Sequence, residues 1–206
     1  MEEEIICAKF LDACKFSDEV LKMLGDCNLE YQNKLGETAL AIASDKNYDA
    51  VIYLLSRNVD VNRPDLNNQT PLMRASFYGE ADIVEALLNN GASVNNQDIN
   101  GLTALMKAAI RGEGNLKVFE LLIANGADVN LQDINGETAL SYACAIFHTE
   151  VAVFLINNGA DYNLKNNNGI SAWEIAHDNT EVIALIEHKE LTKESRNQES
   201  EFPIGL

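Results

Sequence analysis

The sequence predicts an all-α solenoid, a stack built from copies of one small helical module. The first observation is that the phrase DINGLTAL at residues 98–105 restarts as DINGETAL at residues 133–140. The second is a hydroxyl residue that marks each copy at intervals of about 33 residues. The third is a pair of short apolar stripes with helical spacing after each marker. The markers are Thr38, Thr70, Thr103, Thr138 and, in the fifth copy, Ser171.

Each copy is expected to open with a tight turn and a capped helix. Asp98 and Gly101 occupy the first and fourth places of a type I turn. Thr103 follows where its hydroxyl can accept a hydrogen bond from a backbone N–H at the helix start. Pro71 stands directly after Thr70, at the first helical position, where its missing N–H costs nothing.

A second helix should follow in each copy and end at a left-handed residue, which is Asn58, Gly91, Gly126 or Gly159. Helices this short are marginal alone in water, because even good helix formers need about 12–15 residues. Each pair of helices must therefore bury its apolar stripes against the next pair, and short hairpin turns should join the pairs.

The recurring pattern D-x-x-G-x-T-A/P-L…A-A…G…L-L…G-A-x-V-N resembles the ankyrin repeat. The resemblance covers residues 33–188, and the Asn- and Ile-rich wording is similar to bacterial members of the family. It implies a right-handed stack of helix-turn-helix units. The family's His after T-P-L is replaced by other residues, so the hydrogen bond that it makes to Thr is expected to be missing. The replacements are Ala41, Met73, Met106, Ser141 and Glu174.

One elongated ankyrin domain is expected over residues 1–188. Within it the sequence predicts an N-terminal cap at 2–32, full repeats at about 33–64, 65–97, 98–132 and 133–165, and a C-terminal cap at 166–188. Trp173 is expected to fill the core at the closed end of the stack. Residues 189–206 are polar and show no periodicity, which predicts a disordered tail.

Composition restricts the classes of partner. The formal net charge is −17, from 15 Lys and Arg against 32 Asp and Glu. Nucleic acids and anionic membrane surfaces both attract basic proteins, so neither is expected as a partner. An acidic surface fits a basic protein partner, although it also serves solubility alone. The N-terminus has no basic region with an apolar stretch after it, and no apolar run is long enough to span a membrane. Four cysteines without framework spacing indicate a cytoplasmic protein.

No catalytic or metal-binding pattern is found in the sequence. The three histidines are scattered, and none has a second ligand at a zinc-site interval. The Asp-x-Asn-Gly turns lack the closing Glu of a calcium loop. Cys14 and Cys144 stand where other repeats carry small residues, so packing explains them better than reactivity. No enzymatic activity, cofactor or metal is therefore expected.

The resemblance also implies where a partner binds, since ankyrin arrays use the turn tips and the inner face of the first helices. The residues at those places in the three middle repeats are Leu66, Gln69, Phe77, Tyr78, Ile99, Leu102, Ile110, Arg111, Ile134, Glu137 and Ile146. Aromatic, aliphatic and Arg side chains on a surface are typical of a binding hot spot. Ile99 and Ile134 could instead pack beneath the turns. The outer repeats are more polar at these places, with Asp45 and Lys46 at one end.

These observations predict a monomeric, non-catalytic platform that binds another protein through a concave groove. One alternative is an inhibitor or immunity-type protein that neutralises a basic toxin or enzyme, as the acidic composition suggests. A second alternative is a secreted effector that acts inside a host cell. Fold resemblance does not choose among these functions.

Overall fold

A computed structural model of the chain describes residues 28–111 and 116–201, with side chains as far as Thr192. Most of the expected N-terminal cap at 2–32 lies outside these ranges. The first helices of successive pairs are α3 (Ala39–Ala43), α5 (Pro71–Tyr78), α7 (Ala104–Arg111), α9 (Ala139–Ala145) and α11 (Ala172–Ile175). The second helices are α4 (Tyr48–Ser56), α6 (Ala81–Asn89), α8 (Leu116–Ala124), α10 (Thr149–Asn157) and α12 (Thr180–Glu201), the last preceded by a 3-10 turn, η1 (Ala176–Asp178).

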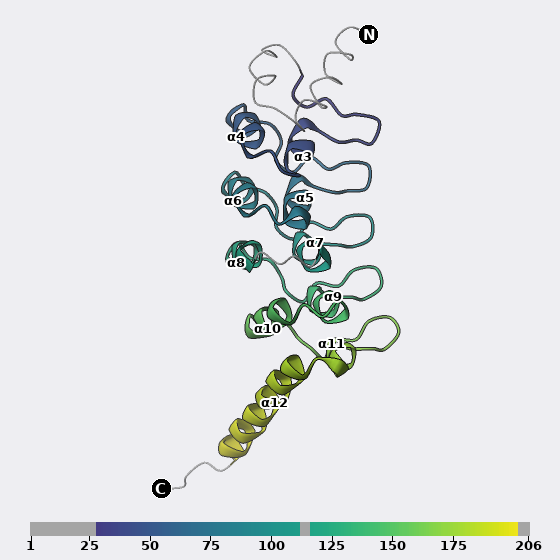
Figure 1. Cartoon of the computed structure of the whole chain (residues 1–206), viewed down its shortest axis with the longest axis vertical. Helices are drawn as coiled ribbons and strands as arrows, with labels where there is room; N and C mark the ends of the chain where they lie inside the picture. Colours follow the sequence, from purple (N-terminus) through teal and green to yellow (C-terminus); the bar gives the residue numbers. More distant parts are fainter. Residues whose placement is uncertain (1–27, 112–115, 202–206) are drawn as a thin grey trace.

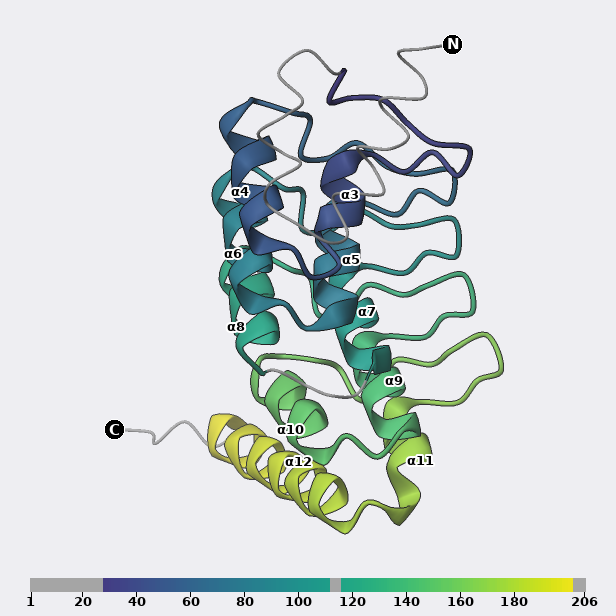
Figure 2. The ribbon, with the colours of Figure 1, turned by 45° about the horizontal axis from the view of Figure 1, so that its top comes forward.

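The helix pairs form two columns, and the turns between pairs project to one side (Figure 1). The first helices form the column next to the turns, and the second helices form the outer column (Figure 2). Each first helix packs against the first helix of the next pair, as α5 does against α7 and α7 against α9. The expected all-α repeat solenoid is therefore confirmed.

Each turn is organised by one acidic or amide side chain. In the third repeat Asp98 Oδ1 accepts hydrogen bonds from the N–H of Asn100 at 2.8 Å and of Leu102 at 3.0 Å. The N–H of Gly101 bonds the Asp98 carbonyl, and Gly101 has a φ of 77°, which favours glycine. The Thr103 hydroxyl accepts the N–H of Met106 and so caps α7, as expected.

The residues that replace the family's His have a role that the sequence reading missed. The Ser141 hydroxyl and the Glu174 carboxylate each accept the backbone N–H of the marker residue three places earlier, at 2.8 and 2.7 Å. These bonds complete reciprocal capping boxes at the starts of α9 and α11. Where Ser141 and Glu174 replace the family's His, their side chains therefore support the start of their own helix.

Hydrogen bonds between repeats form three ladders along the turns. At the tips, the N–H groups of Leu66, Ile99 and Ile134 each donate to a carbonyl of the preceding turn at 3.0–3.1 Å. Asn side chains that bond the next repeat supply a second ladder. Asn95, for example, accepts the N–H of Asp128 and donates to the Gly126 carbonyl. A Gln directly before three of the turns, at positions 32, 97 and 132, supplies a third, since Gln97 Nε2 donates to the carbonyls of Gly101 and Gln132. Neighbouring turns are thus held in one register.

The core lies between the two helix columns. Its largest fully buried side chain is Phe119 of α8, and the first helices contribute alanines that allow close approach of the columns. Cys144 is buried at one of these small-residue places as a free thiol. Burial raises its pKa to about 12, so packing explains this residue, as expected.

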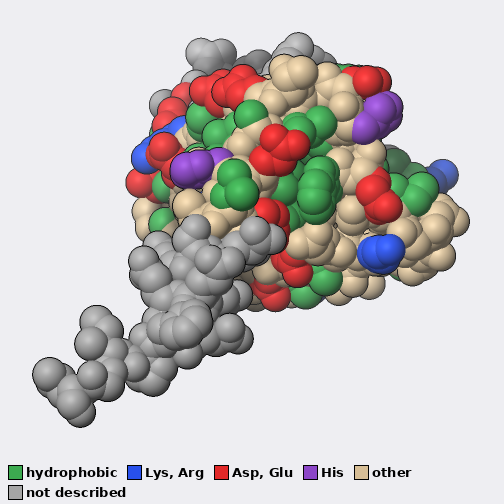
Figure 3. All heavy atoms as spheres, turned by 90° about the horizontal axis from the view of Figure 1, so that it is seen from below, with side chains coloured by type: hydrophobic (Ala, Val, Ile, Leu, Met, Phe, Trp, Pro, Cys, Tyr) green, Lys and Arg blue, Asp and Glu red, His purple; other side chains and the backbone are tan. Residues whose placement is uncertain are grey.

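Two expectations for the C-terminal end are wrong. The chain is helical to Glu201, where the sequence predicts a disordered tail from residue 189. Val182 and Ile186 anchor the start of α12 in the core, and the helix-forming Glu, Lys and Leu residues after them allow it to continue. Trp173 is 39% exposed, because the truncated last repeat has no further repeat to cover it. Hydrophobic side chains reach the surface at this end of the stack (Figure 3).

Candidate functional site

The turn tips present a row of exposed aliphatic side chains, here called the tip row. It consists of Leu66, Ile99 and Ile134, which are 72, 56 and 60% exposed, together with Leu35 in the first turn. The alternative that Ile99 and Ile134 pack beneath the turns does not hold at these exposures. The tip ladder fixes the spacing of the row, and the core does not need these side chains. The row is an apolar surface available for contact.

A second group, here called the groove cluster, lies on the inner face of the first helices and consists of Lys46, Phe77, Tyr78 and Arg111. Phe77 and Tyr78 end α5, and their rings meet edge to face with centroids 5.3 Å apart. The Arg111 guanidinium at the end of α7 lies 5.3 Å from the Phe77 ring and 5.2 Å from the Tyr78 ring. Lys46, from the repeat before, lies 5.8 Å from the Tyr78 ring. All three distances from a cation to a ring are short enough for cation–π attraction.

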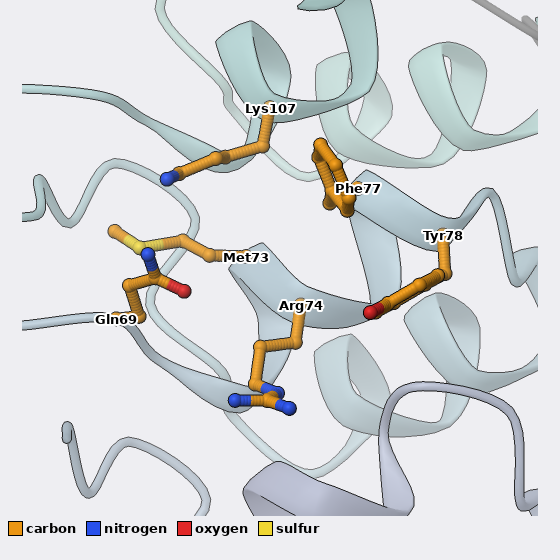
Figure 4. Close-up of a pocket in the computed structure, with 6 residues that line it drawn as sticks. All are labelled: Gln69, Met73, Arg74, Phe77, Tyr78 and Lys107. Atoms are coloured by element: carbon orange, nitrogen blue, oxygen red, sulfur yellow. The ribbon is translucent and has the colours of Figure 1, made fainter. Parts of the chain in front are cut away.

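A cavity of about 200 Å³ opens beside the two aromatic residues. Six residues from α5, α7 and the turn before α5 line it, namely Gln69, Met73, Arg74, Phe77, Tyr78 and Lys107. Figure 4 shows Phe77 and Tyr78 on one side of the opening, with Gln69 and Met73 across from them. Aromatic surface lies beside amide and cationic groups, which suits a side chain with apolar and polar parts.

The cations that line the cavity are paired with carboxylates. Arg74 holds both oxygens of Asp45 at 2.7 Å and one oxygen of Glu37 at 2.6 Å. Burial alone would lower the pKa of Arg74, but the bonds and charges of Asp45 and Glu37 outweigh it and raise that pKa. Lys107 lies 2.8 Å from Oδ2 of the buried Asp98. These pairs tie the first helices to the turns.

The other expected site residues are distributed along the same inner face. Ile110 is half-buried next to Arg111, and Ile146 lies one repeat further along, directly after α9, where it is exposed. Leu102 packs partly against the core. Glu137 accepts a hydrogen bond of 2.6 Å from Asn166 of the last turn, so it supports the stack. The structure thus brings Phe77, Tyr78 and Arg111 into contact, and gives Leu102 and Glu137 structural roles.

Sequence reasoning missed Met73, Arg74 and Lys107, and assigned Lys46 only to a polar flank. One signal could have found two of them, since Arg74 and Lys107 each stand four places after a marker Thr. That spacing places them on the same helical face as the residues at places seven and eight. Lys46 stands eight places after Thr38, as Arg111 does after Thr103, but this spacing does not show its contact with Tyr78, which arises from stacking of neighbouring repeats.

Neither a cluster of metal ligands nor a membrane-spanning helix is found among the described residues. Across 28–111 and 116–201, no three His, Cys, Asp or Glu side chains cluster as metal ligands would. None of the helices in those ranges combines the length and apolar composition that a bilayer crossing requires.

Two comparisons with known proteins bear on the architecture. A search of curated proteins gave no match. The family model for ankyrin repeats, described as three copies, matches residues 10–98 and 90–166, which is more than half of the chain. The matched residues include the helix pairs from α3 to α10 with their turns, so this chain belongs to the ankyrin-repeat family.

Proposed function

We propose that this chain is a non-catalytic platform that holds another protein in the groove between its turns and its first helices. Ankyrin repeats are generally protein–protein interaction modules, and the family is typically non-enzymatic. The observation that carries the proposal is the tip row, four aliphatic side chains in successive turns, each more than half exposed. Exposed apolar side chains in a continuous row favour a protein partner over solvent.

The groove cluster supports the same proposal. Aromatic and Arg side chains are the types that dominate binding energy at protein interfaces. Phe77, Tyr78 and Arg111 are already held against one another, so little side-chain freedom is lost when a partner binds. A partner that lies across α5, α7 and the tips would contact both groups at once.

The test is a double variant, Tyr78→Ala with Ile110→Asp. It should abolish capture of the partner from the cells that make this protein, while the midpoint of thermal unfolding stays nearly unchanged. The control is Glu85→Ala with Glu120→Ala, which changes exposed residues of α6 and α8 on the outer column. Equal capture by both variants would contradict groove binding, and a large fall in thermal midpoint would make the two residues part of the core.

An inhibitor of a basic protein is the second candidate, and the acidic outer column favours it. Each of α4, α6, α8 and α10 carries at least one exposed acidic side chain, among them Asp49, Asp82, Glu85, Glu120 and Glu150. Such a surface would speed encounter with a basic partner. Under this alternative, Glu85→Ala with Glu120→Ala should lower the association rate constant at low salt. Tyr78→Ala with Ile110→Asp should not lower it.

A further inference from the structure

Charge is divided between the two helix columns in a way that the net charge conceals. Helices α3, α5, α7 and α9 contain no Asp or Glu, whereas every second helix contains at least one. Arg74, Lys107 and Arg111 lie on α5 and α7, and Lys46 lies three residues after the end of α3, whereas α11 carries Glu174. Four cations of this acidic protein are therefore gathered around α5 and α7, beside the carboxylates of Glu37, Asp45 and Asp98.

Two of these four cations are already neutralised, and two make different contacts. Arg74 and Lys107 are bound by Asp45, Glu37 and Asp98 as described above. Arg111 and Lys46 contact the rings of Phe77 and Tyr78. Arg111 is exposed, and the N–H donors of a guanidinium have the fork geometry that matches a carboxylate.

The size of the adjacent cavity indicates what can enter it. At about 200 Å³ it is smaller than the roughly 300–1,000 Å³ of sites that bury a whole small ligand. It fits a single side chain, and the ring of Phe77 offers that side chain apolar contact, whereas Met73 is 1% exposed and has little free surface. A peptide can supply such a side chain together with a neighbouring charge.

From the proposed function, we infer that the partner segment in the groove is acidic. A carboxylate of Asp or Glu binds the guanidinium of Arg111, assisted by Lys46, and an apolar side chain next to it in the segment enters the cavity beside Phe77. A basic segment would instead bring like charges against Arg111 and Lys46, which is costly at an interface. The acidic outer column repels the rest of an acidic partner, so the attraction is confined to the groove.

The experiment is selection of peptides of random sequence, displayed on phage, against the full chain. Selected peptides should carry Asp or Glu within two positions of a Leu, Ile or Phe. A synthetic copy of one selected peptide then serves as the probe in titrations with purified variants. Its dissociation constant should rise at least tenfold in Arg111→Glu, and replacing its acidic residue by the amide should weaken binding to the original chain but not to that variant.

The matched control is Lys117→Glu, which makes the same change of net charge on α8 of the outer column, where Lys117 contacts Glu120. It should leave the affinity unchanged. Equal weakening by Arg111→Glu and Lys117→Glu would overturn the inference, because general charge would then explain it.

The test also separates this inference from the proposed function. Selected peptides that are not acidic, yet are lost in the Tyr78→Ala with Ile110→Asp variant, would overturn the acidic segment and leave groove binding intact. A selection in which no peptide depends on that double variant would overturn both.

Discussion

At the scale of single residues, the glycine at the fourth place of three turns, Gly36, Gly101 and Gly136, lies close to the backbone of the next turn, whereas the second repeat has Asn68 at this place, with a φ of 58°. Gly101 has a φ of 77°, and a Cβ there would lie 2.8 Å from the backbone nitrogen of Ile134 in the next turn. Gly91 has a similar φ of 85° but has no atom within 4 Å of a Cβ placed on it. A substitution at Gly91 therefore introduces backbone strain alone, whereas one at Gly101 introduces backbone strain and a collision with the next repeat.

Gly101→Ala should destabilise the protein more than Gly91→Ala does. Both changes place an alanine in the left-handed region, at about 1–2 kcal/mol. Gly101→Ala also forces the turn of the next repeat to shift, which adds about 1–3 kcal/mol. Urea denaturation followed by circular dichroism measures both. Equal losses would show that the tip ladder tolerates a displaced turn.

The Cys144 thiol gives a prediction about pH. Its folded pKa of about 12 lies above its ordinary value of 9.0, because burial disfavours the thiolate. The folded state therefore favours the protonated form, and this contribution to stability is present below pH 9 and is lost as the pH rises toward 12. In a variant with Ser at positions 7, 14 and 27, the remaining thiol should resist alkylation at pH 8 in the folded protein and react readily in urea. Fast alkylation of the folded protein would contradict burial.

At the scale of elements, the value of a large side chain depends on whether a further repeat covers it. Phe119 of α8 lies in the middle of the stack and is 1% exposed, whereas Trp173 of α11 lies at its end. Trp173 still meets the Tyr162 ring edge to face at 6.5 Å. Trp173 is therefore partly in contact with solvent and partly packed against Tyr162 at the end of the stack.

Phe119→Ala should lower the free energy of unfolding by about 3–5 kcal/mol, as expected for a large side chain removed from a packed interior. Trp173→Ala should lower it by only about 1–2 kcal/mol, although the side chain is larger, because part of it is already in water. Chemical denaturation of the two variants under one condition makes the comparison. The reverse order would show that the end of the stack is better covered than its exposure indicates.

At the scale of the whole molecule, a net charge of −17 on 206 residues implies self-repulsion. The exposed acidic side chains along the outer column place many of these like charges near one another. Inner pairs such as Arg74 with Asp45 are partly buried and respond less to salt. Repulsion should therefore dominate the response of the fold to ionic strength.

Raising sodium chloride from 10 to 150 mM at pH 7 should increase the thermal midpoint by a few degrees. The Debye length falls from about 30 Å to about 8 Å, so repulsion between exposed charges further apart than about 8 Å is largely screened. Scanning calorimetry measures the shift, and sedimentation under both conditions should show a monomer of 22.7 kDa. A midpoint that falls with salt would mean that attractive ion pairs outweigh repulsion.

Much of the fold could be predicted from the sequence because its rules are local. The turn needs Asp98 and Gly101 three residues apart, and the helix cap needs Thr103 three residues before the N–H that it accepts. The apolar stripes repeat within each helix. Such patterns stand in short stretches of chain and recur in every copy, so each copy supports the assignment of the others.

The candidate site could be predicted only in part. The exposed places at the turn tips follow from repeat position, and the row of Leu66, Ile99 and Ile134 is exposed there. Leu102 and Glu137 each stand directly before a marker Thr and are also expected to face a partner. Instead, Leu102 packs partly against the core and Glu137 accepts a hydrogen bond from the last turn. Whether such a side chain faces a partner or its own neighbour depends on packing between repeats, which local spacing does not contain.

The sequence by itself determined the module, its period, its turns and its helix caps, because these depend on residues a few positions apart. Only the tertiary structure decided that Lys46, Phe77, Tyr78 and Arg111 meet, since these residues come from three successive repeats. It also decided that Arg74 pairs with Asp45 and Glu37 and Lys107 with Asp98, and that Trp173 is left partly uncovered. The physical reason is that contacts between repeats depend on how whole modules stack.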